Sequence, residues 1–285
     1  MNRREFVARS AFAGVAAIQR RGPVIRMLLV APAGSPVRAS EMGIRLGIEE
    51  AERAALLFGG SVTLASFSGD ARDPETAGNL ESTVRRTQTT ALFGGDDAPG
   101  CAALSRSADR LGVLYFNVSS SDDALRGAEC RRTTFHVMPS AAMLRDARAR
   151  ADVAVESDAR SVAWDESLER FGADSLNQRF QGRYGRPMTD EAWTGWLAVK
   201  VLWESALRAR TSDPGAIADA LASESMRFDG HKGRTLSFRR WDHQLRQPVY
   251  VVTRGSGAPR IVEVPTAALD ELGVSAEQTT CRWQR

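Results

Sequence analysis

The strongest constraint on the fold is the regular alternation of apolar runs with amphipathic segments across residues 24–137. Val24–Ala31 (VIRMLLVA) is apolar almost throughout and is followed by Pro32, which is typical of a strand buried on both faces of a parallel sheet. The same pattern predicts strands at 62–67, 90–94, 113–118 and 134–137, separated by helices at 40–58, 74–88 and 99–111. This alternation indicates an α/β fold with a doubly wound parallel sheet.

The rest of the chain predicts helices followed by a short hairpin. We expect helices at 140–150, 164–184, 190–210, 213–223 and 266–272, and a single strand at 153–155 between the first two. Strands at 249–253 and 260–264 flank a predicted turn at 254–257. Ser40 is the expected N-cap of the first helix of the chain, and Gly59 its expected end.

The charge distribution argues against nucleic-acid binding. The 285 residues carry a net charge of +3 and are 26% charged, which is ordinary for a globular protein. Residues 1–21 contain five arginines and one glutamate, so they carry +4 and the rest of the chain carries −1. Nucleic-acid binding needs a clustered basic face, and the body of the chain has no basic excess.

The first 21 residues are expected to be an export signal. The sequence Asn2-Arg3-Arg4-Glu5-Phe6 resembles a twin-arginine signal, and the apolar run that follows at 11–18 is too short to span a membrane. We predict a periplasmic protein whose signal is either cleaved or kept as an N-terminal anchor. The alternative is an ordinary amphipathic helix.

Several phrases resemble type I periplasmic solute-binding proteins of ABC transporters. Phe228, Gly230, Gly233, Phe238 and Asp242 match the spacing of the closing segment of that family, where the phrase is structural. Similar phrases lie at 122–127 (DDALRG), 139–144 (PSAAML), 178–180, 185–189 and 193–199. The wording HKGRTLSFRRWDHQLRQP at 231–248 is narrower and resembles the branch found with pyrroloquinoline-quinone (PQQ)-dependent alcohol dehydrogenase systems.

This resemblance implies a protein that binds a small solute for an ABC permease. We expect no cofactor. The resemblance also implies a disulfide between Cys130 and Cys281, whose contexts resemble cysteine positions of the family and which an oxidising compartment would let pair. Cys101, among small and apolar neighbours, is expected to be a packed free thiol.

The sequence departs from the family in the middle of the chain. Only twenty positions separate Leu144 from Trp164, where the family has a second Rossmann-like lobe. We therefore expect a first lobe of residues 22–138 with 165–245, and a reduced second lobe with a C-terminal hairpin from 139–164 and 246–285. The departure favours an alternative function, a non-transporting protein that docks onto a quinoprotein dehydrogenase or a permease. A homodimer would cover an otherwise open site.

Ligand contacts are expected on loops that follow strands, because such sheets bind ligands at the carboxyl ends of their strands. The resemblance implies that hydroxyl groups hold a ligand carboxylate, with Ser121 the best match. The predicted contacts are Ser35, Asp96, Asp97, Ser119, Ser120, Ser121, Asp122 and Trp193.

Three alternatives stay open for these residues. Asp96 and Asp97 equally suit the start of a helix, where acidic side chains are favoured. Asp96, Asp97, Asp122 and Asp123 would together suit a hard cation. Trp193 and Trp196 equally suit core packing.

The sequence does not indicate an enzyme. It contains no P-loop, GxGxxG, GxSxG or HExxH motif. His136, His231 and His243 are scattered and lack metal-ligand spacing, so we predict structural roles for them and no metal site.

Overall fold

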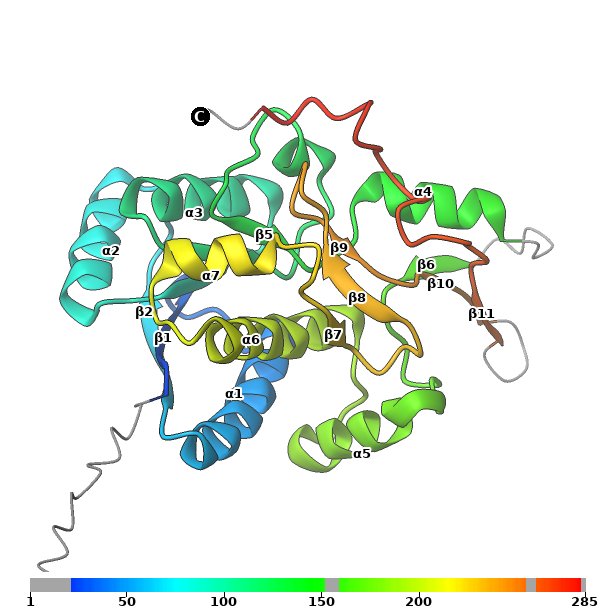
Figure 1. Cartoon of the computed structure of the whole chain (residues 1–285), viewed down its shortest axis with the longest axis horizontal. Coiled ribbons are helices and arrows are strands. Elements are labelled where there is room, and N and C mark those ends of the chain that lie inside the picture. The colour runs from blue at the N-terminus through cyan, green and yellow to red at the C-terminus, as the bar shows by residue number, and fades with distance from the viewer. Residues whose placement is uncertain (1–21, 152–158, 255–259, 283–285) are drawn as a thin grey trace, which may run out of the picture.

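A five-stranded parallel sheet forms the centre of the protein (Figure 1). The structure is a computed structural model that describes residues 22–151, 159–254 and 260–282. The strand order is β2-β1-β3-β4-β5, from β1 (Val24–Ala31), β2 (Ser61–Ser68), β3 (Ala91–Gly94), β4 (Leu114–Asn117) and β5 (Thr134–His136). All residues of β3 and β4 are buried, as their mainly apolar sequences predict. The predicted α/β fold is confirmed.

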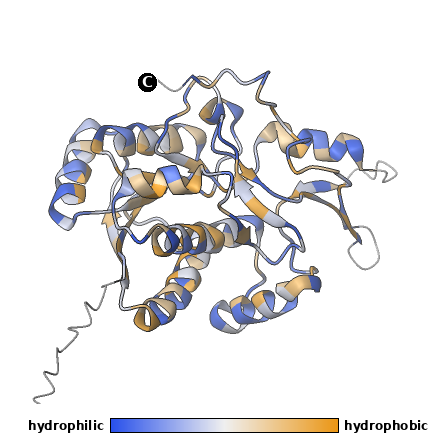
Figure 2. Ribbon diagram, viewed as in Figure 1, coloured by the Kyte–Doolittle hydropathy of each residue, from blue (hydrophilic) through white to orange (hydrophobic). Residues whose placement is uncertain are grey.

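Helices cover both faces of this sheet. On one face α1 (Ala39–Leu57), α6 (Asp190–Ala209) and α7 (Pro214–Leu221) pack on alternate residues such as Met27 and Phe93. On the other face α2 (Pro74–Thr87) and α3 (Ala98–Leu111) pack on Leu28 and Leu92. Hydrophilic and hydrophobic residues alternate along these outer helices, as expected of helices with one buried side (Figure 2).

The first two turns of α1 and α6 lie in direct contact because each helix carries a glycine in its second turn, Gly43 in α1 and Gly195 in α6. A Cβ atom at Gly43 would lie 1.8 Å from the carbonyl oxygen of Ala192, and one at Gly195 would lie 2.3 Å from that of Ser40. These two helix starts therefore form one rigid block beside the carboxyl ends of the strands.

A second, antiparallel sheet lies beside the central sheet (Figure 1). Its order is β11-β10-β6, from β6 (Arg160–Val162), β10 (Tyr250–Thr253) and β11 (Arg260–Glu263). Helix α4 (Ala141–Arg150) packs Met143 and Ala147 against Val249 and Val251 on one face of it. These segments fall within the predicted reduced second lobe, and the lobe boundaries themselves stay a prediction.

The C-terminal phrase forms a third small sheet. It contains β7 (Phe228–Asp229), β8 (Thr235–Phe238) and β9 (Leu245–Arg246), with Phe228 and Phe238 in the core. Gly233 has a φ of +70°, and a Cβ atom there would lie 2.3 Å from the Phe171 ring, so glycine is required. Gln244 forms a parallel bridge with His136, which joins this segment to the edge of the central sheet.

Several local predictions were wrong or fall elsewhere. Arg38 is the N-cap of α1, while Ser40 lies buried inside the helix. The helix expected from residue 164 begins only at α5 (Ala173–Tyr184), because Phe171 and Gly172 adopt left-handed backbone angles in the turn η2 (Arg170–Gly172). Residues 266–272 form no helix, and the strand expected at 153–155 lies outside the described residues.

The cysteines behave as expected. Cys130 and Cys281 form a disulfide that spans 151 positions of the sequence, and Cys101 is a buried free thiol. Within the described part of the chain, no helix is long and apolar enough to cross a membrane.

Candidate functional site

The loops after β1, β3 and β4 meet at the carboxyl edge of the central sheet, as predicted. Arg38, in the first loop, forms an ion pair with Asp96, in the second. The Ser119 hydroxyl, in the third loop, donates a hydrogen bond of 2.5 Å to the carbonyl oxygen of Gly95. Each of the three loops is therefore fixed by a neighbour.

Both aspartates of the β3 loop already have protein partners. Asp97 is the N-cap of α3, where it accepts a 2.8 Å hydrogen bond from the amide of Gly100, and it pairs with Arg72 at 3.0 Å. Burial lowers the pKa of Arg38, the partner of Asp96, while Glu191 and Glu41 oppose that shift. The helix-start interpretation of Asp97 is thus observed directly.

The serine loop after β4 is shaped by Asn117. The Asn117 side chain accepts hydrogen bonds from the amides of Ser119 and Ser120 at 3.3 and 3.0 Å, and donates to the carbonyl of Ser120 at 2.8 Å. The Ser120 hydroxyl is buried and accepts from the amide of Asp122. Ser35 and Ser121 are half-buried, and no hydrogen bond of their hydroxyl groups is found among the described residues.

The four acidic residues considered for a hard cation do not converge. Asp96 and Asp97 pair with separate arginines, and Asp122 caps the short turn η1 (Asp123–Arg126). Asp123 pairs with Arg145 at 2.9 Å. Because the described residues contain no group of three or more His, Cys, Asp or Glu that could hold a metal ion, the cation hypothesis is contradicted.

Trp193 is a core residue. Its side chain is fully buried, its indole NH donates to the carbonyl of Gly230 at 3.1 Å, and its ring stacks on Trp164 at 5.6 Å. The ammonium of Lys232 lies 3.7 Å from the centre of the Trp193 ring. The structure therefore corrects the prediction that Trp193 lines a ligand site, because both faces and the polar edge of the ring have protein partners.

A cleft that the sequence did not reveal lies next to the loops. It has a volume of about 440 Å³ and opens between the joined starts of α1 and α6 and the small antiparallel sheet. Ala39 and Glu191 line it from the helix starts. Arg160, Trp164, Asp165 and Arg254 line it from the β6 and β10 side.

The cleft carries both signs of charge. The Asp190 carboxylate accepts a 2.8 Å hydrogen bond from the amide of Trp164, and burial raises its pKa to about 6. Buried Asp165 pairs with Arg254 at 2.7 Å, and the Arg254 side chain is 42% exposed. A titrating carboxyl and an exposed guanidinium therefore border one space, which suits a small charged or zwitterionic organic molecule.

A buried polar network fixes the serine loop from behind. Arg126 donates through Nε to Gln244 at 2.7 Å, and through its other nitrogens to the carbonyls of Asp122 and Met138 at 2.8 and 2.6 Å. Burial lowers the pKa of Arg126 to about 10. Burial also holds the pKa of His136 well below its usual value, so the neutral imidazole accepts from Asn117 at 3.1 Å.

Sequence reasoning missed the cleft residues and Arg126. Asp190 and Trp164 lie 26 positions apart, and Arg126 and Gln244 lie 118 apart, so no local pattern joins them. The available signal was the start of the 190–210 helix, because Thr189 and Asp190 are typical of a helix N-terminus.

Comparison with known proteins places the fold. The leucine-, isoleucine-, valine-, threonine- and alanine-binding protein of Brucella ovis, in a closed conformation, matches with a TM-score of 0.75 and 11% identity, over 92% of this chain and 99% of that one. An R. palustris solute-binding protein in complex with benzoate matches with a TM-score of 0.67 and 13% identity, over 91% and 99%. The branched-chain amino acid transporter substrate-binding protein of Streptococcus pneumoniae, in complex with isoleucine, gives 0.65 and 13%, over 84% and 99%.

These neighbours share an architecture with the chain at low sequence identity. No protein-family model matches the sequence, and no curated protein matches it. The chain therefore has the fold of the type I periplasmic binding proteins, and its structural neighbours are substrate-binding proteins of ABC transporters.

Proposed function

We propose that this protein is the substrate-binding component of an ABC transport system and takes a small organic solute. The observation that carries the proposal is the cleft of about 440 Å³, lined both by the helix starts of the central sheet and by the small antiparallel sheet. A site shared by two packed units at the carboxyl ends of parallel strands is where α/β proteins of this kind bind ligands.

The proposed solute carries a cationic and an anionic group. A ligand ammonium would lie against Asp190 and Glu191, and a ligand carboxylate against Arg254 or Arg160, with Ala39 and Pro187 as the apolar surface. Ser121, on the loop after β4, is a predicted ligand contact that lies outside the lining of this cleft. Neighbours of the same fold are described in complex with isoleucine, leucine and benzoate, which are organic acids of comparable size.

The finer part of the proposal rests on the sequence resemblance. The phrase at 231–248 supports a transport system linked to PQQ-dependent alcohol oxidation, and residues 1–21 support a periplasmic protein exported by a twin-arginine signal. The alternative is a docking protein for a quinoprotein dehydrogenase or a permease. A homodimer would serve either role by covering the open side of the cleft.

Isothermal titration calorimetry with a panel of amino acids, aromatic acids and amines tests the proposal. A specific ligand should bind the wild type. It should lose at least about tenfold in affinity when Asp190→Asn or Arg254→Gln removes one charged contact, since hydrogen bonds to charged groups contribute about 1.5–3 kcal/mol. Asp219→Asn and Arg179→Gln, which lie outside the cleft, are the matched controls.

Two outcomes would contradict the proposal. One is a ligand whose affinity is the same in the cleft variants and the control variants. The other is a panel in which no compound binds, together with capture of a dehydrogenase by the purified protein, which would favour the docking alternative.

A further inference from the structure

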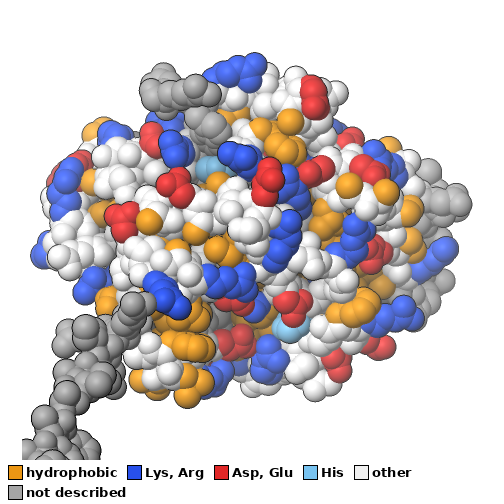
Figure 3. Space-filling view, in the orientation of Figure 1, with side chains coloured by type: hydrophobic (Ala, Val, Ile, Leu, Met, Phe, Trp, Pro, Cys, Tyr) orange, Lys and Arg blue, Asp and Glu red, His pale blue; other side chains and the backbone are white. Residues whose placement is uncertain are grey.

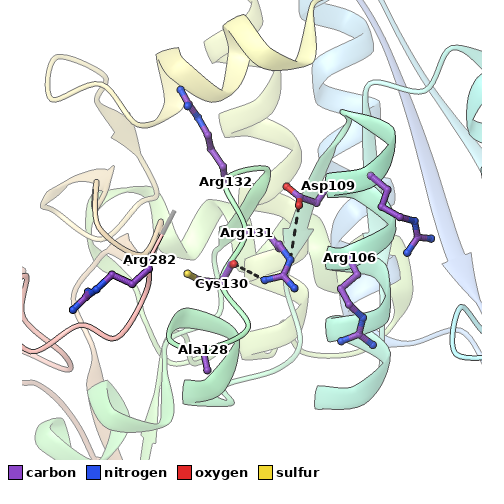
Figure 4. Close-up of a pocket in the computed structure, with 8 residues that line it drawn as sticks. Arg106, Asp109, Ala128, Cys130, Arg131, Arg132 and Arg282 are labelled. Atoms are coloured by element: carbon purple, nitrogen blue, oxygen red, sulfur yellow. Dashed lines mark hydrogen bonds and ion pairs between the residues drawn. The ribbon is translucent and has the colours of Figure 1, made fainter. Parts of the chain in front are cut away.

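A second cavity lies at the opposite edge of the central sheet from the cleft. It has a volume of about 460 Å³ and is lined by the C-terminal part of α3, by the segment before β5 and by Arg282 (Figure 4). Because α3 leads into β4, and Arg131 and Arg132 directly precede β5, this cavity lies at the amino ends of those strands. It is therefore separate from the ligand loops, which follow the strands.

Arginine dominates the lining of this cavity. Five guanidinium groups, from Arg106, Arg110, Arg131, Arg132 and Arg282, surround it, against the single carboxylate of Asp109. The face drawn in Figure 3 mixes acidic and basic side chains, with an apolar patch at the end of α1. The cavity is thus a local basic site on a chain whose body carries no basic excess.

The existing ion pairs of these arginines are weak and replaceable. Arg106 pairs with Glu129 at 3.1 Å and Arg132 with Asp219 at 3.0 Å, with all four side chains at least 42% exposed. Arg131 lies 3.8 Å from Asp109. Exposed pairs of this kind contribute about 0–1 kcal/mol, so carboxylates of a partner can replace them at little cost.

Two of the arginines have no carboxylate partner among the described residues. Arg110 donates only to the Ser107 hydroxyl, at 3.4 Å, and Arg282 donates to the carbonyls of Thr279 and Cys281. The disulfide of Cys130 fixes Arg282 beside Arg131, because Cys281 directly precedes Arg282 and Cys130 directly precedes Arg131. The cavity therefore presents free positive charge on a covalently fixed frame.

We propose that this arginine cavity is a docking site for an acidic segment of a partner protein. The guanidinium groups point in different directions around the cavity rather than toward one point (Figure 4), which suits several carboxylates spaced along a chain better than one compact anion. Guanidinium groups bind carboxylates through paired hydrogen bonds.

A membrane surface fits this site less well than a peptide. The large exposed apolar side chains of the described residues are Val37, Leu56, Leu57, Phe58 and Phe171, and none of them lines the cavity. Asp109, Glu129 and Asp219 alternate with the arginines and would face the anionic headgroups of a flat surface. A flexible acidic segment can place its own carboxylates against the arginines and away from Asp109, Glu129 and Asp219.

Fluorescence anisotropy with a labelled hexaglutamate peptide tests the docking site at physiological ionic strength. The variant Arg110→Gln/Arg131→Gln/Arg282→Gln should bind the peptide about tenfold more weakly than the wild type, because three exposed charge contacts together contribute about that much. The control Arg45→Gln/Arg179→Gln/Arg183→Gln removes the same charge from α1 and α5 and should change the affinity less than about twofold. The thermal midpoints of both variants verify that they are folded, and Arg110→Glu/Arg282→Glu, which changes only exposed residues, is a second pocket variant.

An equal loss of peptide affinity in the pocket and control variants would overturn the proposal, because it would mean that the peptide responds only to the net charge of the protein. A membrane function would be shown instead by two results together. Phosphatidylglycerol vesicles would bind the wild type but not the pocket variant, and the peptide would bind both proteins equally. Neither result bears on the cleft, so failure here is distinguishable from failure of the proposed transport function.

Discussion

Replacement of Arg126 is the sharpest test of how the serine loop is held in place. The Arg126 side chain is 5% exposed and donates to four acceptors: the side chain of Gln244 and the carbonyls of Ser120, Asp122 and Met138. These acceptors belong to the loop after β4, to the residues after β5 and to the C-terminal phrase. One guanidinium therefore joins three segments that are distant in the sequence.

The expected cost of Arg126→Met follows from these contacts. Methionine fills much of the volume but leaves four acceptors without their donor, and a buried polar group left unsatisfied costs about 1–3 kcal/mol. Partial relaxation and water entry reduce the sum, so we expect a loss of about 3–5 kcal/mol in the free energy of unfolding, similar to other broken buried charge networks. Arg126→Lys, which keeps the charge but not the planar fork, should lose less.

Urea denaturation followed by circular dichroism measures this loss. Arg72→Met is the matched control, because Arg72 is also an arginine of the site region but is 48% exposed, and its loss should be below about 1 kcal/mol. Hydrogen exchange should show faster exchange at the amides of Ser119 and Ser120 in Arg126→Met alone. A loss in Arg126→Met no larger than in the control would refute the view that this network holds the loop.

Three further predictions concern the disulfide, export and pH. Cys130→Ser/Cys281→Ser should lower the free energy of unfolding by up to about 5 kcal/mol, since the disulfide closes a loop of 151 positions. Cys101→Ser, which breaks no disulfide, should not cause a loss of this size. Equal losses for the two variants in urea titrations would contradict this. Arg3→Lys/Arg4→Lys should abolish twin-arginine export, and an unchanged periplasmic yield on immunoblots would argue for another route. Burial holds the pKa of Asp190 at about 6 in the folded state, above its usual 3.8, so the free energy of unfolding should fall as the pH rises from about 4 to 6. Asp190→Asn should remove this fall. Identical pH profiles of unfolding for the wild type and Asp190→Asn would refute the prediction.

The sequence predicted the central sheet well because each of its strands is defined locally. The run at Val24–Ala31 is apolar except for Arg26, β3 is apolar and β4 is apolar up to Asn117. The helices α2 and α3, each with an aspartate N-cap, separate the strands β2, β3 and β4. The strand β6 was missed because Arg160-Ser161-Val162 is too short and polar to show a period. It forms by pairing with β10, which lies about ninety positions later in the chain.

The site was predicted only as far as topology determines it. The rule that strands end at one edge correctly brought Asp96, Ser119 and Gly95 together. It did not show that Arg38 and Arg72 occupy both aspartates, since the direction of a side chain depends on tertiary packing. Trp193 was placed in the site for the same reason, because its partner Lys232 lies 39 positions away and the sequence does not show their contact.

The C-terminal phrase connects the cleft to both sheets. Lys232 is buried between the rings of Trp193, on α6, and Tyr250, on β10, and donates to Gln247 at 2.9 Å. Gln247 in turn donates to the carbonyl of Val137, directly after β5, at 2.7 Å. Rotation of the sheet β11-β10-β6 away from the central sheet would have to break these hydrogen bonds and the packing of the Lys232 side chain against both rings. The contacts of Lys232 and Gln247 therefore hold the two walls of the cleft together, and a solute entering it meets a site that is already formed.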